Sequence, residues 1–116
     1  IFFHGRVSRN KLLNFYKNSL GMICLGYDET FCLNAIEAMK MGLPVISLGE
    51  TALKELIIDN KNGFKVNNIN NIDEAIFDLI KLSHNQRKRI SKSSVESTKK
   101  FSSKFIFKKW DNFIKR

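Results

Sequence analysis

The chain has 116 residues, of which 43% are hydrophobic, and a formal net charge of +9 at pH 7. This length suits one domain rather than two, and no apolar run approaches the ~20 residues that span a bilayer as a helix. The charge lies in the C-terminal third, because residues 81–116 hold twelve Lys/Arg against two Asp/Glu, while residues 1–80 hold eight against nine.

The chain opens on an apolar run. Residues 1–4 are typical of a buried strand, and Gly5-Arg6-Val7 forms the turn after it. Ser8 is a good N-cap for a helix over residues 9–17. The inward stripe of this helix consists of Leu12, Leu13, Tyr16 and Leu20.

A strand–helix–strand unit follows. Residues 22–25 form a second apolar run, residues 31–41 a helix, and residues 43–48 the next strand. Gly42 suits the left-handed end of the helix, and Pro44 prevents its continuation. A short helix over 52–57, a turn over 59–63 and a strand over 64–66 complete the predicted core.

Helices fill the rest of the chain. Asn71 and Glu74 resemble a capping box at the start of the next helix, whose inward face is Ile72, Ala75, Ile76, Leu79 and Ile80. A weakly amphipathic helix over about 86–100 is anchored by Ile90 and Val95, and a last helix covers 104–115. We expect an α/β fold: a Rossmann-like parallel sheet of about four strands flanked by helices, with residues 1–66 as core and 67–116 as terminal helices.

The cysteines and histidines predict no metal site. Cys24 and Cys32 lack the spacing of zinc ligands, and His4 and His84 are far apart in sequence. Cys24, inside an apolar run, fits a small buried hydrophobe in a reducing cytosolic compartment. The N-terminus has neither a signal-peptide pattern nor an initiator Met, so we expect a piece of a longer cytoplasmic protein.

Two glutamates bracket the start of the helix over 31–41. Glu29 precedes it and Glu37 lies two turns inside it. Carboxylates accept hydrogen bonds from vicinal sugar hydroxyls, while the unpaired N–H groups of the first turn, near Cys32, Leu33 and Asn34, suit phosphate oxygens. The pattern therefore favours a nucleotide sugar as ligand.

The segment E-T-F-C-L-N-A-I-E-A-M over 29–39, followed by G-L-P-V-I, resembles the E-x7-E motif of the group 1 retaining glycosyltransferases of the GT-B fold. L-K-E-L-I-I-D over 53–59 and N-G-F-K-V over 62–66 are similar to the segments that follow in the family. The resemblance is close over residues 1–66 and loose beyond them. It implies the C-terminal donor-binding domain of a hexosyltransferase-type enzyme that uses a nucleotide diphosphate sugar, with no cofactor and no required metal.

The resemblance also implies roles for individual residues. Glu29 would act on the hydroxyls of the donor sugar, as the catalytic residue of this chain, and Glu37 would bind the ribose. The remaining donor-binding positions would be the backbone of Phe31, Cys32, Leu33 and Asn34 around the pyrophosphate and the turn Gly5-Arg6-Val7 beside the nucleobase. The sugar would be transferred with retention to a glycan or lipid-linked acceptor, in polysaccharide biosynthesis.

Three departures from the family pattern stand out. Cys32 occupies a position that usually holds glycine, and Thr51-Ala52 replaces a Gly-Gly pair. The Arg and Lys that neutralise the diphosphate, together with the acceptor-binding domain, would lie upstream of residue 1. Without those upstream strands, we expect residues 1–4 to be poorly paired or to find another partner.

Other interpretations of single residues remain open. Acids near a helix start can merely complement its dipole, and Cys32 could be an activated thiolate. His4 is more typical of a packed or partly exposed residue than of a ligand. Glu55 is more typical of a structural residue.

The basic last helix has two candidate partners. Its apolar face suits docking on the missing N-terminal domain, which the sequence favours, or peripheral contact with the inner face of a membrane. Nucleic acid is not expected, because no base-stacking pattern of aromatic and basic residues is present. The alternative function is a noncatalytic nucleotide-sugar-binding or interaction module.

Overall fold

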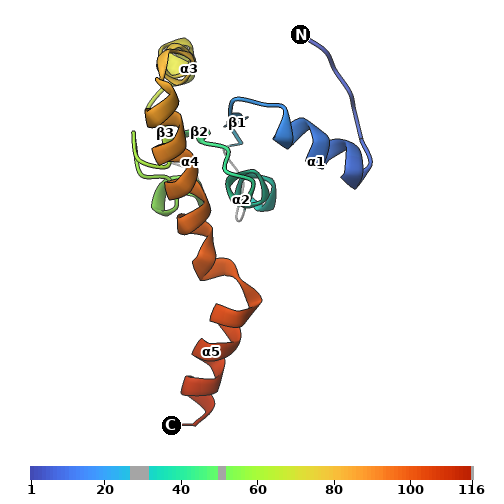
Figure 1. Ribbon diagram of the computed structural model, residues 1–116, viewed down its shortest axis with the longest axis vertical. Coiled ribbons are helices and arrows are strands. Elements are labelled where there is room, and N and C mark those ends of the chain that lie inside the picture. Colours follow the sequence, from blue (N-terminus) through green and yellow to red (C-terminus); the bar gives the residue numbers. More distant parts are fainter. Residues whose placement is uncertain (27–31, 50–51, 116) are drawn as a thin grey trace.

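The structure is a computed structural model that describes residues 1–26, 32–49 and 52–115, and every structural statement below refers to these residues. Helices lie on both sides of a small central sheet (Figure 1). The elements in chain order are α1 (Arg9–Lys17), β1 (Met22–Cys24), α2 (Leu33–Lys40), β2 (Val45–Leu48), η1 (Ala52–Glu55), β3 (Gly63–Val66), η2 (Ile69–Asn71), α3 (Ile72–Lys81), α4 (His84–Thr98), η3 (Lys99–Phe101) and α5 (Ser103–Ile114).

The described sheet is parallel and has the strand order β1-β2-β3. Val45 pairs with Met22 on one side and with Gly63 on the other. All four residues of β2 are buried, and successive side chains point to opposite faces. Val45 packs in the cluster that includes α2, and Ile46 in the cluster that includes α3 and α4. The predicted α/β class with a parallel sheet is confirmed.

The predicted first strand does not form, which agrees with the expectation that residues 1–4 would be poorly paired without upstream strands. Residues 1–4 form no strand, and Phe2 and Phe3 are 89% and 94% exposed. The described sheet therefore has three strands instead of about four. An apolar run becomes a buried strand only when a neighbour supplies backbone partners and a packing surface, and here the His4 ring merely contacts the Phe15 ring at 4.8 Å between centroids.

The turn from α2 into β2 confirms the predicted helix end. Gly42 has φ +82°, and its N–H donates to the carbonyl of Met39 while the N–H of Leu43 donates to the carbonyl of Ala38. This pair of bonds is a Schellman motif, which satisfies carbonyls at the helix end. A Cβ on Gly42 would lie 2.4 Å from the Ser91 Oγ, so α4 packs too closely here for a larger residue.

Polar side chains attach α4 to the sheet. The Ser94 hydroxyl is shared between the carbonyls of Leu43 and Asn62, at 3.0 and 2.8 Å. Ser94 is fully buried, whereas Val95, the expected anchor, is 38% exposed. The predicted anchor Ile90 is buried as expected.

Asn62 is the polar centre of this attachment. Its fully buried amide donates to the carbonyl of Leu56 at 3.0 Å and to the hydroxyl of Ser97 at 2.7 Å. Its Oδ1 accepts from the N–H of Ile58 at 2.7 Å. Both the oxygen and the nitrogen of the Asn62 side chain therefore have hydrogen-bond partners. These bonds compensate the cost of removing the amide from water.

One helix-start prediction differs from the structure. Asn71 is the N-cap of α3, but its side chain makes no capping bond. The capping box lies instead at α4, where the Ser83 side chain accepts from the N–H of Gln86 and the Gln86 side chain accepts from the N–H of Ser83. Ser8 caps α1 as predicted.

Two residues expected on inward helix faces are exposed. Leu20 is 56% exposed because α1 ends at Lys17 and no longer carries it. Ile80 is 52% exposed, since the buried stripe of α3 is narrower than predicted and centres on Ala75 and Leu79.

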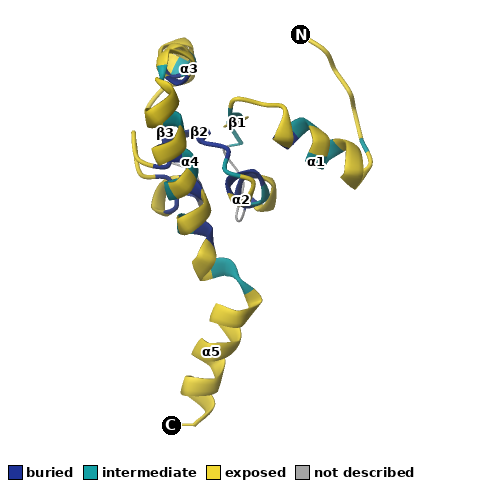
Figure 2. Cartoon of the chain, viewed as in Figure 1, coloured by how far each residue is buried: buried dark blue, intermediate teal, exposed yellow. Residues whose placement is uncertain are grey.

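The last helix stands clear of the rest of the molecule. In Figure 1, α5 extends away from the sheet and its covering helices, so that the molecule measures 51 Å along its longest axis. None of its described residues is buried (Figure 2). The helix therefore has a sequence typical of a packed element without a surface to pack on.

Candidate functional site

The predicted donor site lies where β1 leads into α2, at the carboxyl edge of the sheet. Cys24 is the last residue of β1, and Cys32 is the N-cap of α2. Glu29 and Phe31 lie between them, outside the described residues. The described part of the predicted site therefore consists of Cys32 and the α2 residues, together with the turn before α1.

The first turn of α2 is placed as the sequence predicts. The carbonyl of Cys32 accepts the N–H of Ile36 at 3.2 Å, and Leu33 and Asn34 are exposed. The first N–H groups of any α-helix have no partner within the helix and lie at the positive end of its dipole. The Cys32 side chain makes no capping hydrogen bond to this first turn.

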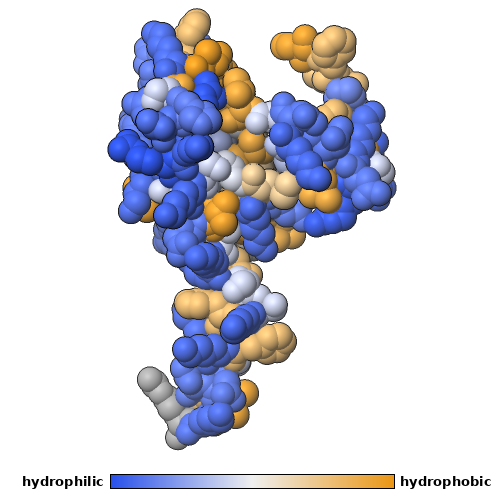
Figure 3. All heavy atoms as spheres, in the orientation of Figure 1, coloured by the Kyte–Doolittle hydropathy of each residue, from blue (hydrophilic) through white to orange (hydrophobic). Residues whose placement is uncertain are grey.

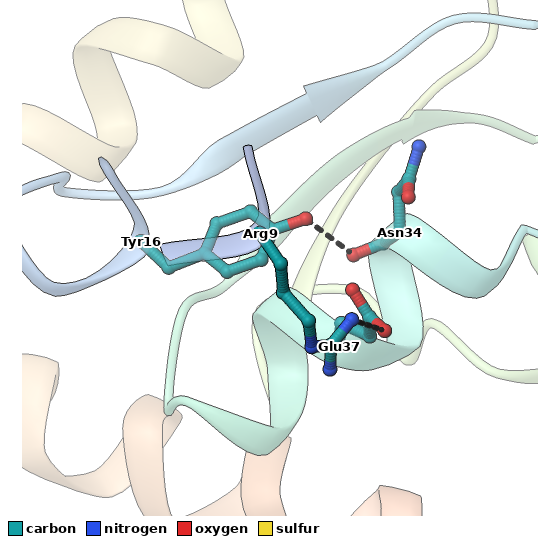
Figure 4. Close-up of polar contacts among 4 residues, drawn as sticks. All are labelled: Arg9, Tyr16, Asn34 and Glu37. Atoms are coloured by element: carbon teal, nitrogen blue, oxygen red, sulfur yellow. Dashed lines mark hydrogen bonds and ion pairs between the residues drawn. The ribbon is translucent and has the colours of Figure 1, made fainter. Parts of the chain in front are cut away.

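Glu37 forms an ion pair that the sequence analysis did not predict. Its Oε1 accepts from the Nη1 of Arg9 at 3.0 Å (Figure 4), and the two side chains are 30% and 69% exposed. A pair this exposed contributes about 0–1 kcal/mol to stability. Its main effect is therefore to orient the carboxylate.

Tyr16 connects α1 to the same part of α2. Its hydroxyl donates to the carbonyl of Asn34 at 3.5 Å, as Figure 4 shows, and its side chain is buried. Burial raises the pKa of the Tyr16 phenol above its ordinary value, and the charges of Glu37 and Cys32 raise it further, while Arg9 opposes them. The phenol is therefore a neutral donor at physiological pH.

The turn before α1 is exposed at both Gly5 and Arg6, and partly buried at Val7. Gly5 has φ +59°, and no atom lies within 4 Å of a Cβ built on it. Arg9 begins α1 directly after Ser8 and reaches Glu37. The turn is therefore only two residues before Arg9, the residue that contacts the Glu37 carboxylate.

A second feature that sequence reasoning missed is the contact between the two thiols. The Sγ atoms of Cys24 and Cys32 lie 3.1 Å apart. The eight-residue separation gave no signal of this contact, because it depends on the path from β1 into α2. Arg9 and Tyr16 were likewise unpredictable as site residues, since they come from a separate helix that packs against α2.

A hollow of about 350 Å³ lies at the opposite edge of the sheet. It is lined by residues of α1, α3 and α4 together with the Gly42–Pro44 turn, including Tyr16, Leu79 and Arg87. The Arg87 guanidinium donates to the carbonyls of Ile80 and Leu82, at 2.7 and 3.2 Å. Because this hollow lies at the amino ends of the strands, it is separate from the predicted donor site.

The comparisons with known proteins agree with this fold. The sequence model described as "Glycosyl transferases group 1" matches residues 1–97. The chain belongs to the group 1 glycosyltransferases. No curated protein matches the chain significantly.

Among solved structures, this glycosyltransferase chain is similar to the C-terminal domain of a glycosyl transferase group 1 family protein (LpcC) from Francisella tularensis. The TM-score is 0.74 at 26% sequence identity, and the match covers 88% of the present chain and 53% of that structure. The chain therefore spans about half the length of the solved domain.

The described residues contain neither a cluster of metal-ligating side chains nor a helix that could span a membrane. No group of three or more His, Cys, Asp or Glu side chains in residues 1–26, 32–49 and 52–115 is arranged to hold a metal ion. Within the same ranges, no helix has both the length and the apolar character to cross a membrane.

Proposed function

We propose that the chain supplies the donor-binding part of a glycosyltransferase that uses a nucleotide diphosphate sugar. The observation that carries the proposal is the juxtaposition of the α2 helix start with the Glu37 carboxylate, in a chain of the group 1 family. The helix start suits the diphosphate, and the carboxylate suits ribose hydroxyls.

Glu37 keeps one oxygen for a ligand in this arrangement. Arg9 binds its Oε1, and Oε2 can accept a hydrogen bond from a ribose hydroxyl while the ion pair stays intact. Arg9 thereby acts as a positioning residue. Glu29 takes the hydroxyls of the donor sugar, and Phe31 to Asn34 offer backbone N–H groups to the diphosphate.

The reaction is a hexosyl transfer with retention of anomeric configuration. The acceptor hydroxyl of a glycan or lipid-linked glycan attacks the anomeric carbon, the bond to the diphosphate oxygen breaks, and the departing diphosphate takes the acceptor proton. This assignment needs no cofactor and no metal. It also needs an acceptor-binding domain beyond these residues, so the chain alone binds donor without transferring it.

The test is a calorimetric screen of the chain against UDP-, GDP- and ADP-sugars. We expect one nucleotide class to bind, and Glu29→Gln and Glu37→Gln each to weaken it at least about tenfold, which corresponds to about 1.4 kcal/mol. Glu55→Gln is the matched control, because Glu55 is an exposed glutamate at the end of η1. Equal affinity in all variants would remove the site assignment.

A second proposal concerns α5. We infer that its apolar face contacts an anionic membrane surface on the cytoplasmic side. Trp110, Phe113 and Ile114 are 60%, 70% and 75% exposed, and Figure 3 shows apolar side chains interspersed with polar ones along this helix. On a helical projection, Ile106, Phe107, Trp110, Phe113 and Ile114 share one face.

Charge favours a lipid surface as the occupant. Residues 104–115 carry the lysines Lys104, Lys108, Lys109 and Lys115 against the single acid Asp111. Lysines around an apolar aromatic face are typical of helices that lie in the interface of an anionic bilayer. Docking on another protein domain is the competing occupant, and the vesicle experiment given in the Discussion separates the two.

A further inference from the structure

Two thiols meet across the junction between β1 and α2. The Sγ atoms of Cys24 and Cys32 are 3.1 Å apart, although the residues come from different elements. A disulfide bond is about 2 Å long, so bond formation needs an approach of only about 1 Å. Cys24 is partly exposed, whereas Cys32 is 3% exposed, so an oxidant reaches Cys24 first.

A buried hydroxyl lies beside this pair. Ser47 is the register partner of Cys24 in the parallel sheet, and neighbouring partners point to the same face. Ser47 is fully buried, and its Oγ has no hydrogen-bond partner among the described residues. Its O–H is therefore a buried polar group on the same face of the sheet as the Cys24 side chain.

Burial separates the roles of the two cysteines. Cys32 is the N-cap of α2 and packs in an apolar cluster with Ala35, Ile36 and Val45. Thiols buried in apolar surroundings react less readily than exposed ones. Cys24 is therefore the residue that meets an oxidant, and Cys32 lies close enough to attack the oxidised sulfur.

We propose that Cys24 and Cys32 form a redox-active dithiol that a hydroperoxide converts into an intramolecular disulfide. The Cys24 thiolate attacks one peroxide oxygen, the O–O bond breaks, and Cys24 becomes a sulfenic acid. The second oxygen leaves as an alcohol or water after taking the proton that Cys24 released.

Cys32 completes the reaction. Its sulfur attacks the Cys24 sulfur, the S–O bond breaks, and the hydroxyl group leaves as water with the proton of the Cys32 thiol. The two sulfurs together lose two electrons, which reduce the two peroxide oxygens. A small dithiol such as dithiothreitol reverses the step by thiol–disulfide exchange.

A disulfide in the oxidised chain would restrict the movement of the predicted donor site. The bridge closes a ring over residues 24–32, which contains Glu29, and ties the first turn of α2 to the end of β1. Resting on the proposed function, we expect oxidation to weaken nucleotide-sugar binding at least about threefold, because the tethered helix start can no longer adjust to the ligand.

The test treats the reduced 116-residue chain with hydrogen peroxide, unfolds it, alkylates it with N-ethylmaleimide and measures intact mass. We expect a species about 2 Da lighter than the reduced chain, with no alkylated cysteine. Dithiothreitol should restore both alkylation sites. In urea, where the thiols are no longer held together, the same oxidation should be at least about tenfold slower.

Matched variants and a second measurement complete the design. Cys24→Ser and Cys32→Ser each keep one thiol, and neither should give the lighter species. The proposal is overturned if the folded wild type keeps two alkylatable thiols, or if it forms the bridge no faster than the urea-unfolded chain. Neither mass measurement involves a nucleotide, so the absence of donor binding by the reduced chain would refute the proposed function separately.

Discussion

The strand β2 and the helix α5 are both rich in apolar side chains, but their surroundings are opposite. Every residue of β2 is buried between two neighbouring strands and two helical layers, whereas no described residue of α5 is buried. The comparison shows that the spacing of apolar residues predicts a helix or strand and its apolar face. Whether that face is buried depends on a packing partner elsewhere in the chain or outside it. In β2 the chain itself supplies the partner, whereas the described residues supply none for the apolar face of α5.

The greatest loss of stability is expected for a substitution where β3 packs against β2. A Cβ on Gly63 would lie 2.3 Å from the carbonyl oxygen of Val45, which is backbone and cannot rotate away. We expect Gly63→Ala to lower the free energy of unfolding by about 3 kcal/mol or more. Urea denaturation followed by circular dichroism measures it, since the single tryptophan lies on α5.

Gly49→Ala is the matched control for this substitution. The nearest atom to its Cβ would be 3.5 Å away, an ordinary contact. Equal losses of stability in the two variants would contradict the close approach of β2 and β3 at Gly63.

A slightly smaller loss is expected at the polar attachment of α4. Asn62→Ala removes a fully buried amide and leaves the carbonyl of Leu56 and the N–H of Ile58 without these partners. We expect the free energy of unfolding to fall by about 2–3 kcal/mol in urea titration. Asn70→Ala, at an exposed position in η2, should change it by less than about 0.5 kcal/mol. A neutral Asn62 variant would show that the attachment does not stabilise the core.

A pH titration tests the boundary between α1 and the core. The folded-state pKa of Tyr16 is raised above 10.0, so the folded chain holds the phenol proton more tightly than the unfolded chain. The associated stability is present below about pH 10 and is lost as pH rises through the folded-state pKa. We expect the stability difference between wild type and Tyr16→Phe to shrink over this range, and curves that stay parallel would refute it.

Substitutions on the exposed face of α5 should change the free energy of unfolding least. Trp110→Ala with Phe113→Ala removes two exposed rings that touch each other, with centroids 6.2 Å apart. We expect the free energy of unfolding to change by less than about 0.5 kcal/mol, because no core contact is lost. Binding to vesicles that contain anionic phosphatidylglycerol should fall at least about tenfold at low salt.

Phe77→Ala is the control for the vesicle experiment, because Phe77 is an aromatic residue on α3 that is 58% exposed. It should leave vesicle binding unchanged. If the wild-type chain does not sediment with these vesicles, the membrane assignment fails and α5 is a protein-docking helix.

Local signals predicted most of the fold. Ser8, Gly42 and the apolar stripes act through nearest neighbours, and they located α1 and the end of α2 and indicated a parallel sheet. Failure came where the outcome depended on a distant partner. Residues 1–4 have a strand-like sequence but no neighbouring strand. Ser94 replaced Val95 as an anchor because its hydroxyl donates to the carbonyls of Leu43 and Asn62, which lie just before β2 and β3.

The candidate site was only partly predictable for the same reason. The helix start at Cys32 follows from local sequence, and the structure places it as expected. The ion pair of Glu37 with Arg9 joins residues 28 positions apart, and the Cys24–Cys32 contact depends on the path of the chain between two elements. The roles of Glu29 and Glu37 toward a donor remain predictions.

The shared hydroxyl of Ser94 also has a consequence for synthesis on the ribosome. It connects to Leu43, which is 51 residues earlier, and to Asn62, which is 32 residues earlier. The sheet strands therefore emerge well before the helix that holds their polar edges together. Until α4 has been translated, the nascent chain carries an Asn62 amide without its Ser97 partner and an open apolar surface, which is the stage at which chaperone binding or early aggregation would act.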